Sequence, residues 1–350
     1  MSQLVVIAAG PATSVQDAGR FGAQRYGLTS SGAMDRISLA VANTLVENCT
    51  FAAAIEVGPL PASFTARDGA MRIALSGAAR TADIAGTPLP HNETALIAEG
   101  ETLKLGAARN GMFSYLAIEG GIKGEPVFGS LSVNARAGLG SPFPRPLQAG
   151  DTLDAGVAKL TTYERALDIP DWPKSAIRVV MGPQDDEFGT ACDVFLNNDW
   201  RVSATSDRMG YRLEGSKIVH TGGHNIVSDG AVRGSIQVPG NGQPIVLMAD
   251  HGTTGGYPKI ATVISADLGR FAQMQAGSTI RFKAINVEDA QTEARKLAEF
   301  LHALPDRIHP AGGSSLNLLE LQQANVAGAA VNAIDTATWQ TQIAGEPQRK

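Results

Sequence analysis

The sequence predicts a mostly β protein made of barrels or sandwiches, with a few peripheral helices. Three observations indicate this class. Short apolar runs recur along the chain, turns with glycine and proline separate them, and clear helical periodicity is confined to two stretches. The 39 glycines and the aromatic content of only 5% fit many tight turns and close backbone approaches. A loop-rich α/β fold is the alternative.

The N-terminal half begins with a predicted strand over Leu4 to Ala8 and continues into a polar loop over Thr13 to Asp35. A loop of this length inside a compact domain is usually functional or covers an interface. Asp35 is a suitable N-cap, and apolar residues at helical spacing predict a helix over 36–47. The runs that follow predict strands at Ala54–Val57, Ser63–Thr65, Met71–Leu75, Thr94–Ile97, Thr102–Leu105 and Met112–Ile118.

A polar segment with two prolines, Thr161 to Ser175, separates two strand-rich halves and predicts a domain boundary. We expect an N-terminal β-rich domain over 1–160, a C-terminal β-barrel domain over 176–285, and a helical C-terminal extension over 286–350. Within that extension, apolar residues on one face predict a surface helix over Val287 to Leu304.

The second half opens with a predicted strand over Ile177 to Met181 and a weakly helical stretch over Asp186 to Leu196. Its centre is Ile236 to Leu268, in which two apolar runs, Ile245–Ala249 and Ile260–Ile264, alternate with glycine- and proline-rich turns and predict strands. Binding and catalytic residues tend to lie on loops that a rigid sheet holds in place. The polar side chains of these turns are therefore site candidates.

A short pattern, Gly-x-Thr-(Leu/Ile), occurs within 99–105, 149–153 and 276–282. Each copy predicts a tight turn that leads into a strand, and the last strand extends over Thr279 to Ala284. The pattern occurs in both halves, as it would in two related barrels.

Composition and charge argue against several classes of partner. The formal net charge is -5, and no cluster of Lys and Arg suggests nucleic acid or an anionic membrane. No segment approaches the roughly 20 apolar residues of a membrane helix, and the N-terminus lacks the basic start of a signal peptide. Cys49 and Cys192 lie far apart, so we expect free, buried thiols and a cytoplasmic protein.

The common short catalytic motifs are absent from the sequence, including the phosphate loop, the dinucleotide fingerprint and the nucleophile elbow of serine hydrolases. His220 and His224 have a spacing that could suit a metal. The Thr-Gly-Gly between them makes a turn and no third ligand is evident, so we expect no metal site.

Four polar clusters with glycines remain as site candidates, at 16–25, 184–187, 206–212 and 237–259. Glutamine amides both donate and accept hydrogen bonds, which suits a small amide or ureido substrate such as urea, a lactam or the biotin ring. The residues that we expect to bind substrate are Gln16, Asp17, Arg20, Gln184, Asp185, Gln237, Gln243, Thr254 and Tyr257.

Four side chains are candidates for catalysis. Asp207 or Asp250 could act as the acid or base, and Arg208 and Lys259 could stabilise an oxyanion or a carboxylate. Ordinary turn chemistry is the alternative for such aspartates, and the two charged residues of the first loop could simply pair to hold that loop.

Five long motifs follow one another along the chain: S-V-Q-D-A-G-R-F-G-A-Q-R-Y-G-L-T-S-S-G-A-M-D, M-G-P-Q-D-D, S-D-R-M-G-Y-R-L-E-G, G-S-I-Q-V-P-G-N-G-Q-P-I-V-L-M-A-D and T-T-G-G-Y-P-K-I-A-T-V-I-S-A-D-L. With these motifs the chain resembles the family of the 5-oxoprolinase C subunits. The same family is described as allophanate hydrolase subunit 2, as biotin-dependent carboxyltransferases and as KipI antagonists (KipA). The resemblance runs from about Leu4 to Lys283.

The resemblance implies tandem cyclophilin-like β-barrel domains, in agreement with the strand-rich pattern. It also implies two partner proteins, one KipI-like (the B subunit) and one LamB/YcsF-like (the A subunit), with which members cleave 5-oxo-L-proline to L-glutamate using ATP. We therefore expect a subunit of an ATP-dependent 5-oxoprolinase that is inactive alone. ATP would serve the assembled complex, at a site that we do not identify in this chain.

Two alternatives follow from the same resemblance. The chain could be the carboxyltransferase component of a biotin-dependent, urea-type carboxylase, or a non-catalytic antagonist that binds a KipI-like kinase inhibitor. The sequence has no Lys-Met pair of the kind used for biotin attachment. We expect no covalent biotin in this chain, so a carboxyltransferase role would need biotin on another chain.

Overall fold

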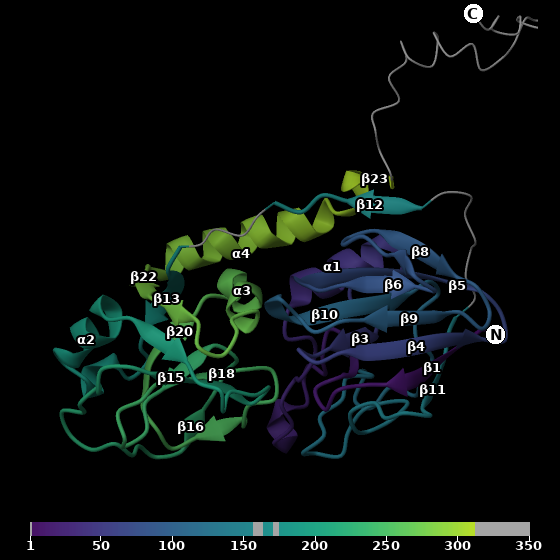
Figure 1. Ribbon diagram of the computed structural model, residues 1–350. Coiled ribbons are helices and arrows are strands. Elements are labelled where there is room, and N and C mark those ends of the chain that lie inside the picture. Colours follow the sequence, from purple (N-terminus) through teal and green to yellow (C-terminus); the bar gives the residue numbers. More distant parts are fainter. Residues whose placement is uncertain (1, 157–163, 171–174, 312–350) are drawn as a thin grey trace, which may run out of the picture. The chain divides into compact units, whose positions relative to one another are not determined.

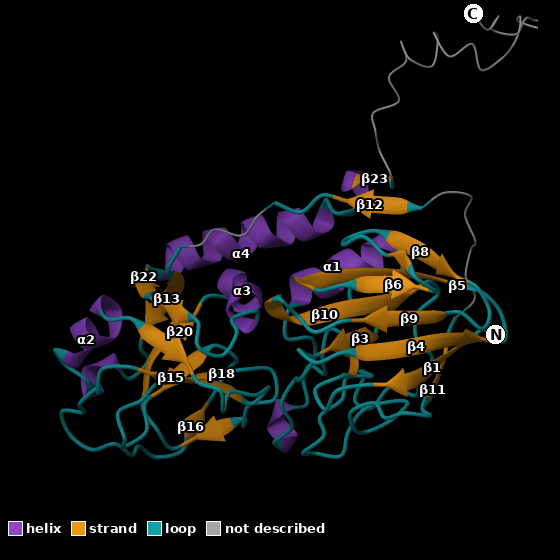
Figure 2. Cartoon of the chain, viewed as in Figure 1, coloured by secondary structure: helices purple, strands orange, loops and turns teal. Residues whose placement is uncertain are grey.

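Strands dominate the computed structural model, which describes residues 2–156, 164–170 and 175–311 (Figure 1). The protein is 33% strand and 17% helix, so the mostly β prediction is confirmed (Figure 2). The residues up to Ala311 belong to one compact unit. Within the described ranges, no helix is long and apolar enough to cross a membrane.

Two antiparallel sheets make up the N-terminal part. The first has the strand order β11-β1-β4-β9-β6-β7, and the second has the order β2-β3-β10-β5-β8. The strands of the first sheet are β1 (Gln3–Ala8), β4 (Ala62–Arg67), β6 (Ala82–Ile84), β7 (Thr87–Pro88), β9 (Thr102–Leu105) and β11 (Thr152–Asp154). Those of the second are β2 (Ser14–Gln16), β3 (Ala54–Val57), β5 (Met71–Ala79), β8 (Thr94–Ile97) and β10 (Asn110–Ile118).

Strand β10 is buried on both faces because a core lies on each side of it. Leu116 and Ile118 belong to the core of the two N-terminal sheets. Phe113, Tyr115 and Ala117 belong to a second core, which includes α1 (Arg36–Leu45) and continues into the C-terminal barrel. A strand that is covered on both faces has a nearly continuous apolar sequence, as this one does.

The helix α1 begins where the sequence predicts and ends two residues early. Asp35 caps it, because Oδ1 accepts hydrogen bonds from the backbone N–H groups of the first turn. At the other end Glu47 has a left-handed φ of 55°, and Asn48 N donates to the carbonyl of Asn43 (2.9 Å). This is a Schellman arrangement, which terminates a helix.

The C-terminal part is a nearly closed barrel of eight strands. The strand order is β21-β14-β15-β18-β17-β20-β13-β22, and only Arg281 separates the two edge strands in the sequence. The chain therefore passes directly from one edge of the sheet to the other, which divides the predicted strand 279–284 into two. The strands are β13 (Ile177–Met181), β14 (Trp200–Val202), β15 (Gly210–Glu214), β17 (Ser235–Gln237), β18 (Ile245–Leu247), β20 (Lys259–Val263), β21 (Thr279–Ile280) and β22 (Phe282–Ala284).

Short elements surround these sheets. A separate two-stranded ladder pairs β16 with β19, and another pairs β12 with β23. The bounds are η1 (Gln24–Tyr26), β12 (Arg165–Leu167), η2 (Asp185–Glu187), α2 (Ala191–Asn197), β16 (Asp229–Gly230), β19 (Thr254–Gly255), η3 (Ser265–Asp267), α3 (Leu268–Ala272), α4 (Val287–His302), η4 (Pro305–Arg307) and β23 (Ile308–Pro310).

The predicted domain boundary falls partly on residues 157–163 and 171–174, which lie outside the described residues. The division at 160 and 176 therefore stays a prediction. The predicted extension begins with α4, which confirms the surface helix, although the helix ends at His302. The remainder of that extension, 312–350, also lies outside the described residues.

The three copies of the Gly-x-Thr pattern form the same turn. Gly100, Gly150 and Gly277 have positive φ angles of 83°, 91° and 86°. In each copy the residue after the glycine donates its backbone N–H to the carbonyl three residues before it. Glycine is favoured at the third position of such a turn because it needs a positive φ. The strands β9, β11 and β21 follow at once, which confirms the prediction.

Both cysteines are free thiols, but the expectation that they are buried is wrong. Cys49 is exposed and Cys192 is partly exposed. Cys49 lies beyond the end of α1 at Leu45 and so takes no part in its buried face.

Asp267 connects several elements around the barrel. Its carboxylate, 1% exposed, accepts hydrogen bonds from Arg178 Nη2 (2.7 Å) and Arg270 Nη2 (2.6 Å), and Arg178 also pairs with Glu293 of α4 (2.8 Å). Burial alone would raise the pKa of Asp267, but the hydrogen bonds from the two arginines lower it below its usual value.

Replacing Asp267 by Asn should lower the free energy of unfolding by about 3–5 kcal/mol, because two guanidinium groups lose a buried counter-charge. Urea unfolding at pH 7 measures this loss. The lowered pKa means that the contribution is complete above the usual aspartate pKa of 3.8 and is lost as the pH falls through the folded-state value. Glu293→Gln is the control, with an expected loss of less than about 1 kcal/mol. Equal losses in the two variants would contradict this account.

Candidate functional site

The first polar loop is anchored by Asp17. Its Oδ1 accepts a hydrogen bond from Ser130 Oγ (2.6 Å), and its Oδ2 accepts one from Leu131 N (2.7 Å). Arg20, which is 1% exposed, donates from Nη2 to the carbonyl of Ser132. No ion pair between Asp17 and Arg20 occurs in the described part of the chain. Each side chain attaches the loop to the same neighbouring segment instead.

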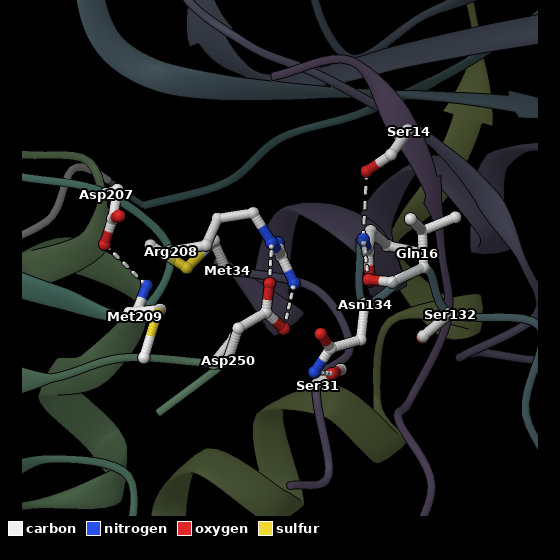
Figure 3. A network of polar contacts seen from close by, with 12 residues as sticks. Ser14, Gln16, Ser31, Met34, Ser132, Asn134, Asp207, Arg208, Met209 and Asp250 are labelled. Atoms are coloured by element: carbon white, nitrogen blue, oxygen red, sulfur yellow. Dashed lines mark hydrogen bonds and ion pairs between the residues drawn. The ribbon is translucent and has the colours of Figure 1, made fainter. Parts of the chain in front are cut away.

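Gln16 is also enclosed at the root of this loop. Its Nε2 donates to Ser14 Oγ (2.9 Å), as Figure 3 shows, and to the carbonyl of Val133 (3.0 Å). Its side chain is fully buried. Gln16 Oε1 and the Nε and Nη1 atoms of Arg20 have no partner among the described residues. These polar atoms are closed to solvent, so they do not present a binding surface in this conformation.

Arg208 joins segments that are far apart in the sequence. It donates from Nε and Nη2 to the two oxygens of Asp250 (2.8 and 3.1 Å), as Figure 3 shows. Nη1 donates to Glu56 Oε1 (2.5 Å), and Nη2 also donates to the carbonyl of Gly32 (2.9 Å). Burial alone would lower the pKa of Arg208, but the charges of Asp250 and Glu56 raise it. The side chain therefore remains a cation.

Glu56 extends the contacts of Arg208 into the N-terminal sheets. It lies in β3 with no exposed surface, and its Oε2 accepts hydrogen bonds from Met34 N (2.8 Å) and from Tyr115 Oη (2.7 Å). Burial, followed by the charge of Glu56, raises the pKa of Tyr115, so the phenol keeps the proton that it donates. We call Arg208, Asp250, Glu56 and Tyr115 the arginine network.

Asp207 shapes the turn that presents Arg208. Its Oδ1 accepts hydrogen bonds from Met209 N (2.8 Å) and Gly210 N (3.2 Å), and its side chain is exposed. This is the turn-forming role that was the alternative to catalysis. Asp250 has both carboxylate oxygens on Arg208. An acid or base role for either aspartate stays a prediction.

A second group of polar side chains surrounds Lys259 in β20. Lys259 is 2% exposed, and its Nζ donates to Asp229 Oδ2 (2.7 Å). Gln184 donates from Nε2 to the same oxygen (3.2 Å), and its Oε1 accepts a hydrogen bond from Lys259 N (3.0 Å). The structure thus brings together residues from two of the predicted polar clusters.

Gln237 completes this group. It is paired with Lys259 across β17 and β20, and its side chain is buried, with 8% exposed. Its Nε2 has no hydrogen-bond partner among the described residues. A Cβ on Gly255 would lie 2.2 Å from that nitrogen, and Gly255 is itself paired with Asp229. We call Gln184, Asp229, Gln237 and Lys259 the lysine cluster.

One loop, 250–257, connects the two groups. It begins at Asp250 in the arginine network and passes Gly255 beside Gln237. His251 lies between them, and burial lowers its pKa, so the ring stays neutral at physiological pH. Within the described ranges, no hydrogen bond or ion pair joins the arginine network directly to the lysine cluster.

The other predicted site residues have separate environments. Both amide atoms of Gln243 bind the backbone of Gly215 (2.9 and 3.2 Å), which is a structural role. Asp185 is exposed in η2. Thr254 is exposed in β19, and Tyr257, which follows that strand, is 40% exposed.

Sequence reasoning missed three members of these groups. Glu56 had a visible signal, because a charge within the apolar strand A-I-E-V must find a partner when it is buried. Tyr115 lies in a similar apolar strand. Asp229 had no signal, because Asp-Gly in a polar loop is ordinary turn chemistry.

A cavity of about 770 Å³ has walls that include Asp35, Asn110, Gln273 and Arg281. None of the predicted site residues lines it. Among the described residues, no three His, Cys, Asp or Glu side chains are grouped as metal ligands.

Replacing Gly255 by Ala should displace the Gln237 amide, because the new Cβ would overlap Nε2. The chain should still fold, since the obstructed atom is the end of a flexible side chain. The side-chain amide signals of Gln237 in an NMR spectrum measure the displacement. Gly256→Ala is the matched control, because the nearest atom to its Cβ would be 3.7 Å away. Equal shifts in the two variants would contradict the close contact.

Comparison with known proteins identifies the family. The chain matches the family model "Carboxyltransferase domain, subdomain A and B" over residues 26–284. The C subunit of the 5-oxoprolinase of Escherichia coli K12 is 38% identical over 87% of this chain and 99% of that protein. Its namesake from Haemophilus influenzae is 36% identical over 81% of this chain and 91% of that protein.

A solved structure supports the same assignment. The crystal structure of the K. lactis urea amidolyase matches with a TM-score of 0.80 and 27% identity, over 88% of this chain and 21% of that chain. The fold and the sequence matches agree, and the chain belongs to the carboxyltransferase-domain family, subdomains A and B.

Proposed function

We propose that this chain is the C subunit of a 5-oxoprolinase and that the lysine cluster binds 5-oxo-L-proline. The observation that carries the proposal is the 38% identity to the corresponding E. coli 5-oxoprolinase protein along almost its whole length. The lysine cluster suits this substrate because a buried ammonium group and two primary amides can bind a carboxylate or a lactam.

The reaction adds water to the lactam carbonyl and breaks the C–N bond, which leaves L-glutamate with a new carboxylate and a free amine. The substrate is an anion through its carboxylate, and a buried ammonium group attracts such a charge more strongly than it would in water. In this proposal Lys259 binds the substrate carboxylate, and Gln184 and Gln237 orient the substrate.

We assign the arginine network a positioning role. Arg208 binds the side chain of Asp250, and the carbonyl of Arg208 accepts a hydrogen bond from Asp250 N (2.8 Å). These contacts fix the start of the loop 250–257, whose Gly255 lies against Gln237. Neither Asp207 nor Asp250 bonds to the lysine cluster in the described ranges, and an acid or base role for either remains part of the proposal.

We further propose that the enzyme is a cytoplasmic, ATP-dependent complex in which this chain is inactive alone. The names of two relatives describe them as subunits, which supports the presence of partners. We expect one KipI-like partner and one LamB/YcsF-like partner. We assign ATP binding to these partners because the sequence of this chain has no phosphate loop.

A second candidate is a carboxyltransferase component that moves a carboxyl group from carboxybiotin to a small amide. The family model and the structural match to urea amidolyase favour it. In that role biotin would be carried by another chain, since this sequence has no Lys-Met pair.

Replacing Lys259 by Met should reduce glutamate formation by the assembled complex by about 100-fold or more, because the positive charge beside the substrate is lost. The assay supplies 5-oxo-L-proline and ATP to this chain together with the KipI-like and LamB/YcsF-like partners. Lys283→Met is the control, because Lys283 is exposed in the edge strand β22, which β13 separates from β20, and the variant should leave turnover unchanged.

Co-purification of the three proteins verifies that each variant still assembles. A complex of wild-type proteins that forms no glutamate would contradict the proposed function. Full turnover by the Lys259 variant would contradict the role of the lysine cluster while leaving the function in place.

A further inference from the structure

Within the lysine cluster, Asp229 binds to Lys259 and Gln184 in the way that a ligand would. Its Oδ2 accepts hydrogen bonds from Lys259 Nζ (2.7 Å) and Gln184 Nε2 (3.2 Å), while its Oδ1 accepts one from its own neighbour, Gly230 N (2.8 Å). The donors come from two buried or half-buried side chains of the barrel. The carboxylate comes from outside, on a side chain that is 52% exposed.

Lys259 requires a carboxylate beside it because its ammonium group is buried. A buried ammonium group is costly unless an anion stays beside it. In the described part of the chain, Asp229 is the only carboxylate that forms an ion pair with Lys259. Asp229 can therefore leave only when another anion takes its place, and such an exchange leaves the charge of the cluster unchanged.

The cluster has more donor capacity than Asp229 uses. Gln237 Nε2 is buried and has no hydrogen-bond partner among the described residues. Gln237 is the strand partner of Lys259, and its amide lies against Gly255, which is in turn the strand partner of Asp229. A buried amide N–H without a partner is uncommon and costs free energy. A ligand placed between Lys259 and Gln237 would satisfy it.

The side chain of Asp229 can turn toward solvent without disturbing a core. Its backbone lies in β16, which pairs with β19, and backbone hydrogen bonds from Thr221 to Glu187 and from Ile226 to Gly256 also hold the segment. Residues 221–230 are exposed except for the partly buried Ile226, and Val227 is 91% exposed. Displacing the Asp229 carboxylate therefore exposes no hydrophobic core.

We propose that Asp229 is an internal occupant of a carboxylate-binding site formed by Lys259, Gln184 and Gln237, and that a small carboxylate ligand binds there by replacing it. Asp229 then regulates access, because every ligand must compete with it. The identification of 5-oxo-L-proline as the natural ligand rests on the proposed function. The exchange itself does not.

Replacing Asp229 by Ala tests the exchange by chemical rescue. The variant should be less stable than the wild type, because Lys259 loses its counter-charge. Sodium acetate should raise its melting temperature by at least about 3 °C when acetate is well above its dissociation constant. Sodium chloride at the same ionic strength should not do so, and wild-type protein should respond little to either salt.

Two further variants separate this effect from general salt stabilisation. Asp229→Asn keeps the shape of the side chain without its charge and should also gain stability from acetate, which covers the case that the Ala variant does not fold. The double variant Asp229→Ala, Lys259→Met should gain nothing. Equal responses of the wild type and both single variants, or a full response of the double variant, would overturn the proposal.

Titration with 5-oxo-L-proline then distinguishes the exchange from the function. Stabilisation of the Asp229 variants by both acetate and 5-oxo-L-proline supports both proposals. Stabilisation by acetate alone supports the carboxylate site and argues against 5-oxo-L-proline as its ligand.

Discussion

A buried positive charge is costly unless an anion stays beside it. Two such cations, Arg208 and Lys259, determine much of how this protein is held together. Arg208 forms ion pairs with two internal carboxylates, those of Glu56 and Asp250, whose side chains are 0% and 12% exposed. Because these partners belong to β3 and to the loop 250–257, the same ion pairs connect the N-terminal sheets with the barrel. Lys259 forms an ion pair with Asp229, whose side chain is half exposed. One cation therefore stabilises the fold, and the other can exchange its partner.

The two groups also depend on each other through the backbone. The arginine network fixes the beginning of the loop 250–257, and the absence of a side chain at Gly255 lets that loop lie against Gln237. Asp207 contributes by shaping the turn before Arg208 rather than by contacting the lysine cluster. The residues that position the loop are thus separate from the residues that offer hydrogen bonds to a ligand.

Local signals made much of the fold predictable. The strands β8, β9 and β13 have the predicted bounds because glycine turns and apolar runs define them within a few residues. The sequence also placed Gln184 and Lys259 among the site candidates, and the structure brings them together. It could not reveal the pair of Glu56 and Arg208, which are 152 positions apart, because such a contact depends on how the sheets pack. Asp229 was missed because nothing in its local sequence distinguishes it from a turn residue.

A crystal structure of this chain with 5-oxo-L-proline would show whether a ligand carboxylate takes the place of Asp229. We expect a ligand carboxylate oxygen at about 3 Å from Lys259 Nζ, a second contact with Gln237 Nε2, and Asp229 turned toward solvent. A ligand bound elsewhere, such as in the cavity beside Asp35 and Gln273, with Asp229 still on Lys259, would contradict the exchange.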